Sequence, residues 1–355
     1  MTSNGFTKAR TMSFPRQVLA GHDVIKETGK MCKDFELEGT AMIVTGQTTG
    51  AVAANEVRDV LVHEGYDIQQ IVVGEATQAN LVKVEEMAKE VRAQFLLGVG
   101  GGSKIDLAKL ASCNLKVPFL SVPTSASHDG LASPRASIKD GGNSLSLNAS
   151  VPLGVVADTA LIVKAPYRLL AAGCADVISN TTAVLDWQLS ERLRTEVFSS
   201  SAANLAKYAA ESIIENASAI KPNLEESVWI AIRPIIISGI SMAVAGSSRP
   251  TSGSEHMFSH VLDKNAPGKA LHGEQCGVGS IMMMYLHGGD WQRIREALLQ
   301  IGAPTCAKDL GVTRELIIEA LVHAHEIRRD RYTVLGDRGL APDAAERLAT
   351  VTKVI

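Results

Sequence analysis

The feature that most constrains the fold is a regular alternation of short apolar runs with helical segments between residues 40 and 123. Runs with the length and β-branched content of strands occupy residues 40–46, 67–74, 94–100 and 117–123. Helical periodicity occupies the intervening residues, 51–64, 78–92 and about 104–112. Strands and helices that alternate in this way form parallel βαβ units with right-handed crossovers. The pattern predicts a doubly wound parallel sheet whose strand ends bind a ligand.

The pattern changes after residue 130. Residues 131–163 predict a hairpin around the turn KDGGN, followed by one more strand in VPLGVVADTALIV. After Pro166 the chain is almost entirely helical. We therefore expect an α/β dinucleotide-binding domain over residues 1–165 and an all-helical domain over residues 166–355, with a ligand cleft between them.

The charge balance argues against a nucleic-acid partner. The chain of 355 residues has 35 Lys and Arg against 38 Asp and Glu, a formal net charge of −3, and only 4% of its residues are aromatic. The most apolar stretch, 228–246, is interrupted by Arg233 and Pro234, and the first thirty residues have no continuous apolar run. We therefore expect a cytoplasmic protein that is not inserted in a membrane.

The cysteines predict reduced thiols. They are odd in number and widely spaced, without a C-x-x-C pair, at Cys32, Cys113, Cys174, Cys276 and Cys306. This usage is typical of a cytosolic protein, and it offers no thiolate at metal-ligand spacing.

Three consecutive glycines mark the first candidate site. GVGGGSKIDLAK, at residues 98–109, lies directly after a buried strand and before a helix. Glycine backbone can approach a ligand closely, and free N–H groups at a helix start favour an anion such as a pyrophosphate. The sequence is neither G-x-G-x-x-G nor a P-loop, so a tight turn without a ligand is the alternative, with Asp106 stabilising the helix dipole.

A second polar loop, PTSASHDGLASPRAS at residues 123–137, follows the next strand and so lies at the same end of the sheet. Its hydroxyl groups suit phosphate and ribose contacts, and the carboxylate of Asp129 suits a polyol hydroxyl. The alternative is a serine-rich turn that satisfies its own backbone.

A carboxylate and three histidines form the third candidate site. We expect Asp176 to lie where GCADVISN opens a helix. His256 and His260 share one helix face, and His272 begins the next helix after the loop DKNAPG. Such ligands suit Zn²⁺ with an open coordination position, and also Fe²⁺ or Ni²⁺. The alternative is a capping aspartate and histidines satisfied within the protein.

Together the motifs GGGSKID, PTSASHDG, SPRAS, GCADVISN, GSEH and LHGE resemble the sn-glycerol-1-phosphate dehydrogenase family. This family belongs with the glycerol dehydrogenases, the iron-containing alcohol dehydrogenases and dehydroquinate synthase. The resemblance covers roughly residues 15–330, and the element SHDG is its most selective part. It implies a reversible, NAD(P)H- and zinc-dependent reduction of dihydroxyacetone phosphate to sn-glycerol 1-phosphate, which supplies the backbone of ether membrane lipids.

The resemblance also implies a role for each site residue. The metal ligands, which are also the catalytic residues, would be Asp176, His256 and His272, and the substrate contacts would be Asp129, Asp176 and His260. The cofactor would be held by Gly101, Gly102, Ser103, Lys104, Ile105, Asp106, Thr124, Ser125, Ala126, Ser127 and Ser133. If it is protonated, His260 could pair with the substrate phosphate, and Arg135 is the weaker candidate for this contact.

Two departures from related families sharpen these expectations. Iron-dependent relatives have a histidine four positions after the metal-binding aspartate, but here Asn180 stands there, which favours a three-ligand zinc site. The first strand runs into Gly46 and Gln47 without the acid that would repel a ribose 2′-phosphate, so we expect NADH and NADPH both to serve.

Three other functions stay open at this point. They are a glycerol dehydrogenase acting on an unphosphorylated polyol, a dehydroquinate-synthase-like cyclase, and a non-catalytic dinucleotide-binding module with a structural metal. We expect a small-molecule substrate, and the apolar helical domain makes a homo-oligomer plausible.

Overall fold

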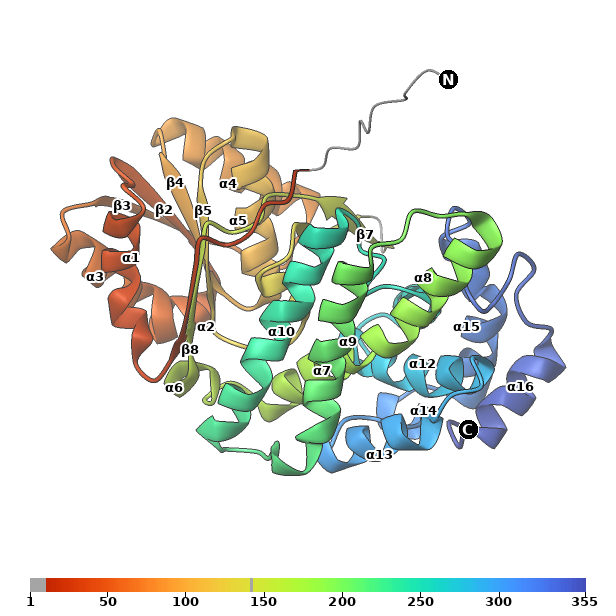
Figure 1. Ribbon diagram of the computed structural model, residues 1–355. Coiled ribbons are helices and arrows are strands. Elements are labelled where there is room, and N and C mark those ends of the chain that lie inside the picture. The colour runs from red at the N-terminus through yellow and green to blue at the C-terminus, as the bar shows by residue number, and fades with distance from the viewer. Residues whose placement is uncertain (1–10, 141–142) are drawn as a thin grey trace, which may run out of the picture.

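The structure is a computed structural model that describes residues 11–140 and 143–355. The first part of the chain forms an α/β half around one sheet, and the remainder packs beside it as a helical half (Figure 1). The predicted fold class, a parallel-sheet domain followed by helices, is confirmed.

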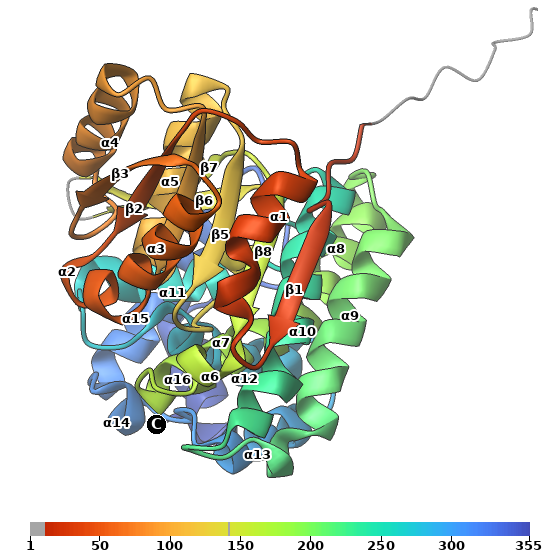
Figure 2. The same cartoon turned by 90° about the vertical axis from the view of Figure 1, so that its left-hand side faces the viewer.

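The central sheet has six parallel strands in the order β1-β8-β5-β4-β2-β3. Its strands are β1 (Gln17–Gly21), β2 (Thr40–Thr45), β3 (Asp67–Val72), β4 (Phe95–Gly100), β5 (Phe119–Pro123) and β8 (Gly154–Asp158). Every residue of β4, β5 and β8 is buried, as expected for parallel strands covered on both faces. Turned by 90°, the molecule shows helices in front of and behind this sheet (Figure 2).

Alternate side chains of the strands face two separate layers of helices. Met42 packs with the cluster that includes Leu81 and Leu107, whereas its neighbour Ile43 packs with Val57 and Leu61. The helical segments of this half are η1 (Val24–Glu27), α1 (Thr28–Asp34), α2 (Gln47–Thr49), η2 (Gly50–Ala54), α3 (Asn55–His63), α4 (Gln78–Glu90) and α5 (Gly102–Leu115).

Two details differ from the sequence prediction. β1 was not predicted, because its five residues are partly exposed at the edge of the sheet and carry no buried apolar run. The strand predicted through TALIV is wrong beyond Asp158, because residues 159–162 form α6 (Thr159–Ile162). The Asp158 carboxylate caps this helix by accepting a hydrogen bond from Leu161 N at 3.0 Å.

The predicted hairpin is present as β6 (Arg135–Asp140) and β7 (Asn143–Asn148), which pair antiparallel. The tip of its KDGGN turn lies outside the described residues. The hairpin extends from the α/β half, and β7 packs against α11 (Ser254–Asn265) of the helical half. Strand pairing therefore places the start of β6 beside the boundary between the two halves.

After Asp158 the described residues contain helices and no strand. The segments are α7 (Tyr167–Ile178), α8 (Asn180–Arg194), α9 (Ser200–Glu215), η4 (Ala217–Ala219), α10 (Glu225–Ala245), α11 (Ser254–Asn265), α12 (His272–Leu286), α13 (Trp291–Ile301), α14 (Ala307–Leu310), α15 (Arg314–Ile327) and α16 (Pro342–Val351). By length and composition α10 could cross a membrane, but 72% of its apolar window is buried inside the molecule. It packs against α9 and α7 as a core helix (Figure 1).

Candidate active site

The loop after β5 lies between the two halves. Its short helix η3 (Asp129–Leu131) packs on α10 and α5. A Cβ atom at Gly239 of α10 would stand only 2.5 Å from the carbonyl oxygen of Asp129, so the helix approaches this loop closely because it has a glycine there. The approach brings Asp129 to the helical half.

The glycine turn after β4 forms the wall of a cavity of about 340 Å³. The cavity is lined by Gly101, Gly102, Ser103, Lys104, Ser125 and Ser127, all of which the sequence assigns to the cofactor. The ring of His128 lies directly over this turn, since a Cβ atom at Gly102 would be 1.9 Å from His128 Nε2. The two polar loops are therefore brought together at one end of the sheet, as expected for consecutive parallel strands.

Other members of the expected cofactor set have buried side chains that face the protein. Ile105 and Ala126 are in the apolar core, and Thr124 is buried. The Ser133 hydroxyl donates to Arg135 O at 3.2 Å. The Asp106 carboxylate accepts from Ser137 N at 3.0 Å and lies 3.5 Å from the Lys109 ammonium. These side chains shape the loops, although Asp106 also lines the cavity.

Lys109 is a fully buried residue that sequence reasoning missed. Its ammonium group donates to Gly130 O at 2.5 Å and to Arg135 O at 2.6 Å, and burial lowers its pKa. It thereby connects α5 to the loop of Asp129 and to the start of the hairpin. A lysine three positions after an aspartate on an apolar helix face was the available signal.

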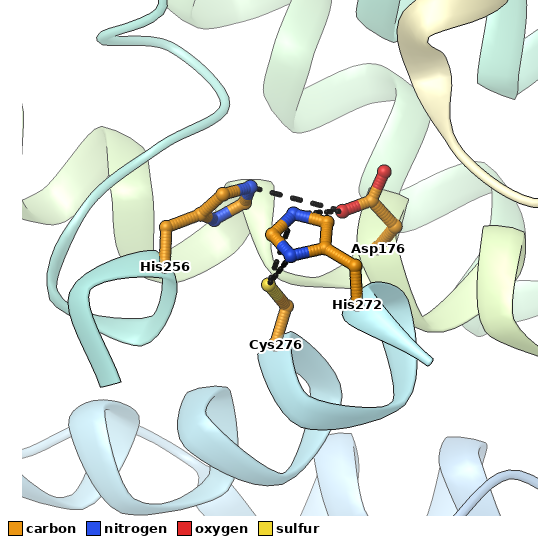
Figure 3. Close-up of side chains that lie close together, drawn as sticks. All are labelled: Asp176, His256, His272 and Cys276. Carbon is orange, nitrogen blue, oxygen red and sulfur yellow. Dashed lines mark hydrogen bonds and ion pairs between the residues drawn. The ribbon is translucent and has the colours of Figure 1, made fainter. Parts of the chain in front are cut away.

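Asp176, His256 and His272 converge where α7, α11 and α12 meet (Figure 3). Asp176 Oδ1 lies 3.8 Å from Nε2 of each imidazole. This oxygen is buried and has no hydrogen-bond partner among the described residues. Asp176 is near the end of α7, so its expected place at a helix start is wrong, and it does not cap a helix.

Neighbouring side chains orient both imidazoles. His256 Nδ1 lies 3.0 Å from Glu255 Oε1, and His272 Nδ1 lies 3.0 Å from Ser259 Oγ. Each histidine therefore directs its Nε2 toward the central position, the arrangement typical of metal-binding histidines. A carboxylate and two imidazoles around an unpartnered buried oxygen fit a divalent cation such as zinc.

Cys276 also belongs to this cluster, in which the four ligand atoms all lie within 4.8 Å of one another. Its sulfur is 3.6 Å from His272 Nε2 (Figure 3). The expectation of no thiol in reach is therefore wrong, and the spacing of His272 and Cys276, four apart on one helix, was the missed signal. Burial raises the pKa of this thiol well above its ordinary value.

Asp129 lies against Asp176. Its backbone N donates to Asp176 Oδ2 at 3.2 Å, and its own Oδ2 accepts from the Ser238 hydroxyl at 2.8 Å. Ser238 in turn accepts from the side-chain amide of Asn180 at 2.9 Å. Burial raises the pKa of each carboxyl to about 7, and for Asp129 the neighbouring Asp176 adds to the effect. Asn180 therefore acts in this network, outside the metal cluster.

His260 lies one turn beyond His256, with its ring stacked 5.9 Å from that of His272. Burial, followed by the two neighbouring histidines, lowers its pKa to about 3. A contact of His260 with a phosphate group would require the protonated imidazole, which burial at this place disfavours.

These groups share a cavity of about 290 Å³. Besides Asp129, Asp176 and the three histidines, the cavity is lined by Arg135 and Arg328. Asp106, Ser127 and His128 line both this cavity and the one at the glycine turn, so the two adjoin. The site can thus hold a dinucleotide on the sheet side beside a metal and a small substrate on the helical side.

Residues 19–166 match the family of iron-containing alcohol dehydrogenases. Among curated proteins, the glycerol-1-phosphate dehydrogenase (NAD(P)+) of Methanosarcina acetivorans is 56% identical over 98% of this chain and 97% of its own length. The enzyme of the same description from Methanothermobacter thermautotrophicus is 55% identical over 98% of this chain and 99% of its own.

Solved structures with the same fold are more distant in sequence. A probable glycerol dehydrogenase from Sinorhizobium meliloti superposes with a TM-score of 0.80 at 19% identity, covering 97% of this chain and 98% of its own. The glycerol dehydrogenase of Schizosaccharomyces pombe gives 0.78 at 19% identity, covering 98% and 91%. The two-part architecture is therefore shared well beyond the relatives with high identity.

Proposed function

The chain belongs to the glycerol-1-phosphate dehydrogenase family, and we propose that it reversibly reduces dihydroxyacetone phosphate to sn-glycerol 1-phosphate with NADH or NADPH. The observation that carries this proposal is the junction of two cavities, one at the glycine turn and one at the Asp176 cluster. A hydride donor and a polarised carbonyl need this proximity. The product would supply the backbone of ether membrane lipids.

Asp176, His256 and His272 are the proposed metal ligands. When bound, zinc supplies Lewis-acid stabilisation of the developing alkoxide, and the nicotinamide supplies the hydride. Glu255 and Ser259 keep the imidazoles oriented before the metal binds, through the 3.0 Å contacts described above.

Asp129 and His260 are the proposed substrate contacts. The Ser238 hydroxyl, 2.8 Å from Asp129 Oδ2, holds this carboxyl while its other oxygen is available to a substrate hydroxyl. The neutral imidazole of His260 can donate one hydrogen bond and accept another. Both side chains line the same cavity as the metal cluster, so they would orient the carbonyl relative to it.

The proposed cofactor residues remain those of the glycine turn and of the loop after β5. Use of both cofactors is supported by the end of β2, where the Lys104 side chain lies against Gly46, since a Cβ atom there would be 2.6 Å from Lys104 Cε. An ammonium group at this place, where the strand itself runs into Gly46 and Gln47 without an acid, is compatible with a 2′-phosphate.

The organisation of the whole protein is also a proposal. We infer domains over residues 1–165 and 166–355, a homo-oligomeric assembly and a cytoplasmic location. Limited proteolysis should cleave first near residue 165 if this boundary is correct, and size-exclusion chromatography with light scattering measures the assembly.

The test of the activity is NADH absorbance with dihydroxyacetone phosphate, beside a second cuvette with unphosphorylated dihydroxyacetone. We expect chelator-sensitive oxidation with the phosphorylated ketone. Oxidation of NADH with the unphosphorylated ketone alone would instead identify a glycerol dehydrogenase, and no oxidation with either would favour the cyclase.

A further inference from the structure

We propose that Arg328, together with Arg135, forms the subsite that binds the phosphate group of the substrate. The inference rests on the proposed function, because it assigns a part of the same cavity to one end of a phosphorylated ketone.

Arg328 carries the first observation. It follows directly after α15 and lines the cavity that contains Asp176 and His256. It is partly buried, yet its guanidinium has no hydrogen bond or ion pair with any residue in the described ranges. A partly buried cation that faces a cavity without a counter-charge favours an anionic ligand.

Arg135 carries the second observation. It begins β6, and its guanidinium donates only to neutral groups, namely Ser146 Oγ at 3.2 Å, Ser146 O at 2.7 Å and Asn148 Oδ1. Burial and the nearby Arg328 lower its pKa, which places the two cations close enough to repel each other. Lys109 holds the carbonyl oxygen of Arg135, so the position of this arginine is fixed relative to the loop of Asp129.

Two further arginines show how the charge is balanced nearby. Arg249 forms a bidentate pair with Glu196, at 2.8 and 2.6 Å, and is therefore neutralised. Arg331 donates to Ser252 O and Ser248 Oγ, both neutral, and burial together with Arg328 lowers its pKa to about 10. Among Arg135, Arg249, Arg328 and Arg331, only Arg249 forms an ion pair with a carboxylate within the described residues.

The carboxylates that line the cavity do not supply the missing charge. None of Asp106, Asp129, Asp176 and Asp263 forms an ion pair with either arginine within the described part of the chain. Asp106 is engaged by Lys109, and Asp129 with Asp176 lies at the metal cluster. A phosphate dianion would balance the two arginines, and the planar guanidinium matches two phosphate oxygens at once.

The cavity therefore has two chemically different ends. Its ketone end has Asp129, Asp176 and the histidines, and its phosphate end has Arg135 and Arg328, with hydroxyls from Ser248, Thr251 and Ser252 also on the wall. A substrate with a carbonyl and a phosphate matches both ends, whereas an unphosphorylated ketone leaves the arginines without a partner.

The test compares Arg328→Ala and Arg135→Gln with the control Arg329→Ala, which changes the next, exposed arginine. For each zinc-loaded protein, kcat/KM is measured with dihydroxyacetone phosphate and with dihydroxyacetone, and the binding of inorganic phosphate is measured by calorimetry. We expect each cavity variant to lower kcat/KM for the phosphorylated substrate by about 10- to 100-fold, mainly through KM. The value of kcat/KM with dihydroxyacetone should fall much less than that with the phosphorylated substrate, and NADH affinity should not follow the loss.

The control should behave as the parent protein, and Arg328→Lys should recover part of the loss because it restores the charge without the planar fork. The proposal is overturned if the cavity variants retain the preference for the phosphorylated ketone and bind inorganic phosphate as the parent does. If instead the parent protein itself does not prefer the phosphorylated ketone, the proposed function is wrong, and this outcome is distinct from failure of the arginine subsite alone. Calorimetry shows whether a variant still binds inorganic phosphate, even where its turnover is too slow to measure.

Discussion

The two sides of the active-site cavity are built in different ways. On the sheet side, the candidate cofactor groups come from two short stretches after β4 and β5, and they are mainly backbone groups and hydroxyls. On the helical side, the candidate metal ligands come from α7, α11 and α12 and are ionisable side chains held by packing. Cofactor binding on the sheet side therefore depends on close approach of the backbone, whereas metal binding on the helical side depends on buried ionisable side chains.

This difference has an energetic consequence. Around the metal cluster, burial raises the pKa of three carboxyls, those of Asp129, Asp176 and Glu255, to about 7. Such groups disfavour ionisation until a cation compensates them. The sheet side buries one ion pair, Asp106 with Lys109, which is already compensated within the protein.

The largest expected effect is on the helical side alone. His256→Ala removes one of two imidazoles that face Asp176, so bound zinc should be lost and turnover should fall at least about 1,000-fold. NADH affinity should be preserved, because the glycine turn is untouched. Metal analysis and NADH fluorescence titration measure the two sides separately, with the exposed His63→Ala as control. A variant that keeps both zinc and full activity would remove His256 from the ligand set.

Lys109→Met tests the connection between the loops of the sheet side. The change leaves Gly130 O, Arg135 O and the Asp106 carboxylate without their buried cation. We expect the free energy of unfolding in urea to fall by about 3–5 kcal/mol. The matched control is Lys83→Met on the exposed face of α4. Equal stability of both variants would show that the buried ammonium is not a structural connection.

Gly102→Ala should weaken cofactor binding on the sheet side and leave zinc binding on the helical side unchanged. The added methyl group would meet His128 Nε2 at 1.9 Å, so the imidazole that lies over the glycine turn must move. We expect NADH affinity to fall roughly 10- to 100-fold, by the 1–3 kcal/mol typical of overpacking, with zinc content unchanged. Gly74→Ala, which meets only an ordinary contact at 3.6 Å, is the control. Loss of zinc in place of NADH would contradict the separation of the two sides.

The stability of the metal-free protein should depend on pH because of the buried carboxyls beside the metal cluster. Burial raises the folded-state pKa of Asp129 and Asp176 to about 7, well above the ordinary value of an aspartate in an unfolded chain. Their contribution to stability is therefore complete below about pH 4 and is lost as pH rises through 7. The melting temperature of the metal-free protein should fall over this window relative to that of the zinc-loaded protein, whose ligands are deprotonated. If the melting temperatures of both forms changed by the same amount between pH 5 and 8, this expectation would be wrong.

The smallest effect is expected for Cys276→Ala. The thiol lies 3.6 Å from His272 Nε2, but burial favours its protonated form, and three other ligands already leave an open position for substrate. Zinc affinity should change by less than about tenfold. A cobalt-loaded parent protein should lack the strong charge-transfer absorbance of a thiolate ligand. If that absorbance is present and disappears in the variant, Cys276 is a fourth ligand.

The sequence predicts features that depend on local patterns better than features that depend on contacts between distant segments. Strands β2, β3, β4 and β5, the glycine turn and the spacing of His256 with His272 are local patterns, and the sequence predicts each of them close to its observed position. Strand β1 has no such pattern, because it lies partly exposed at the edge of the sheet. Cys276 also has a local signal, because it lies four residues after His272 on the same helix, but a single cysteine at this spacing does not by itself predict a metal ligand.

Lys109 and Arg328 are different, because their roles depend on partners contributed by distant segments. The carbonyl groups that Lys109 binds lie 21 and 26 positions away. Arg328 reaches the cavity only because α15 packs against α11. Neither relation leaves a periodic signal in the sequence.

The most direct test of the account is the initial rate of NADH oxidation with dihydroxyacetone phosphate as zinc is returned to the metal-free protein. We predict that the rate rises in proportion to bound zinc until each chain holds one ion, while NADH affinity stays constant throughout. A metal-free chain that already reduces dihydroxyacetone phosphate at the full rate would contradict the assignment of the Asp176 cluster to the chemistry.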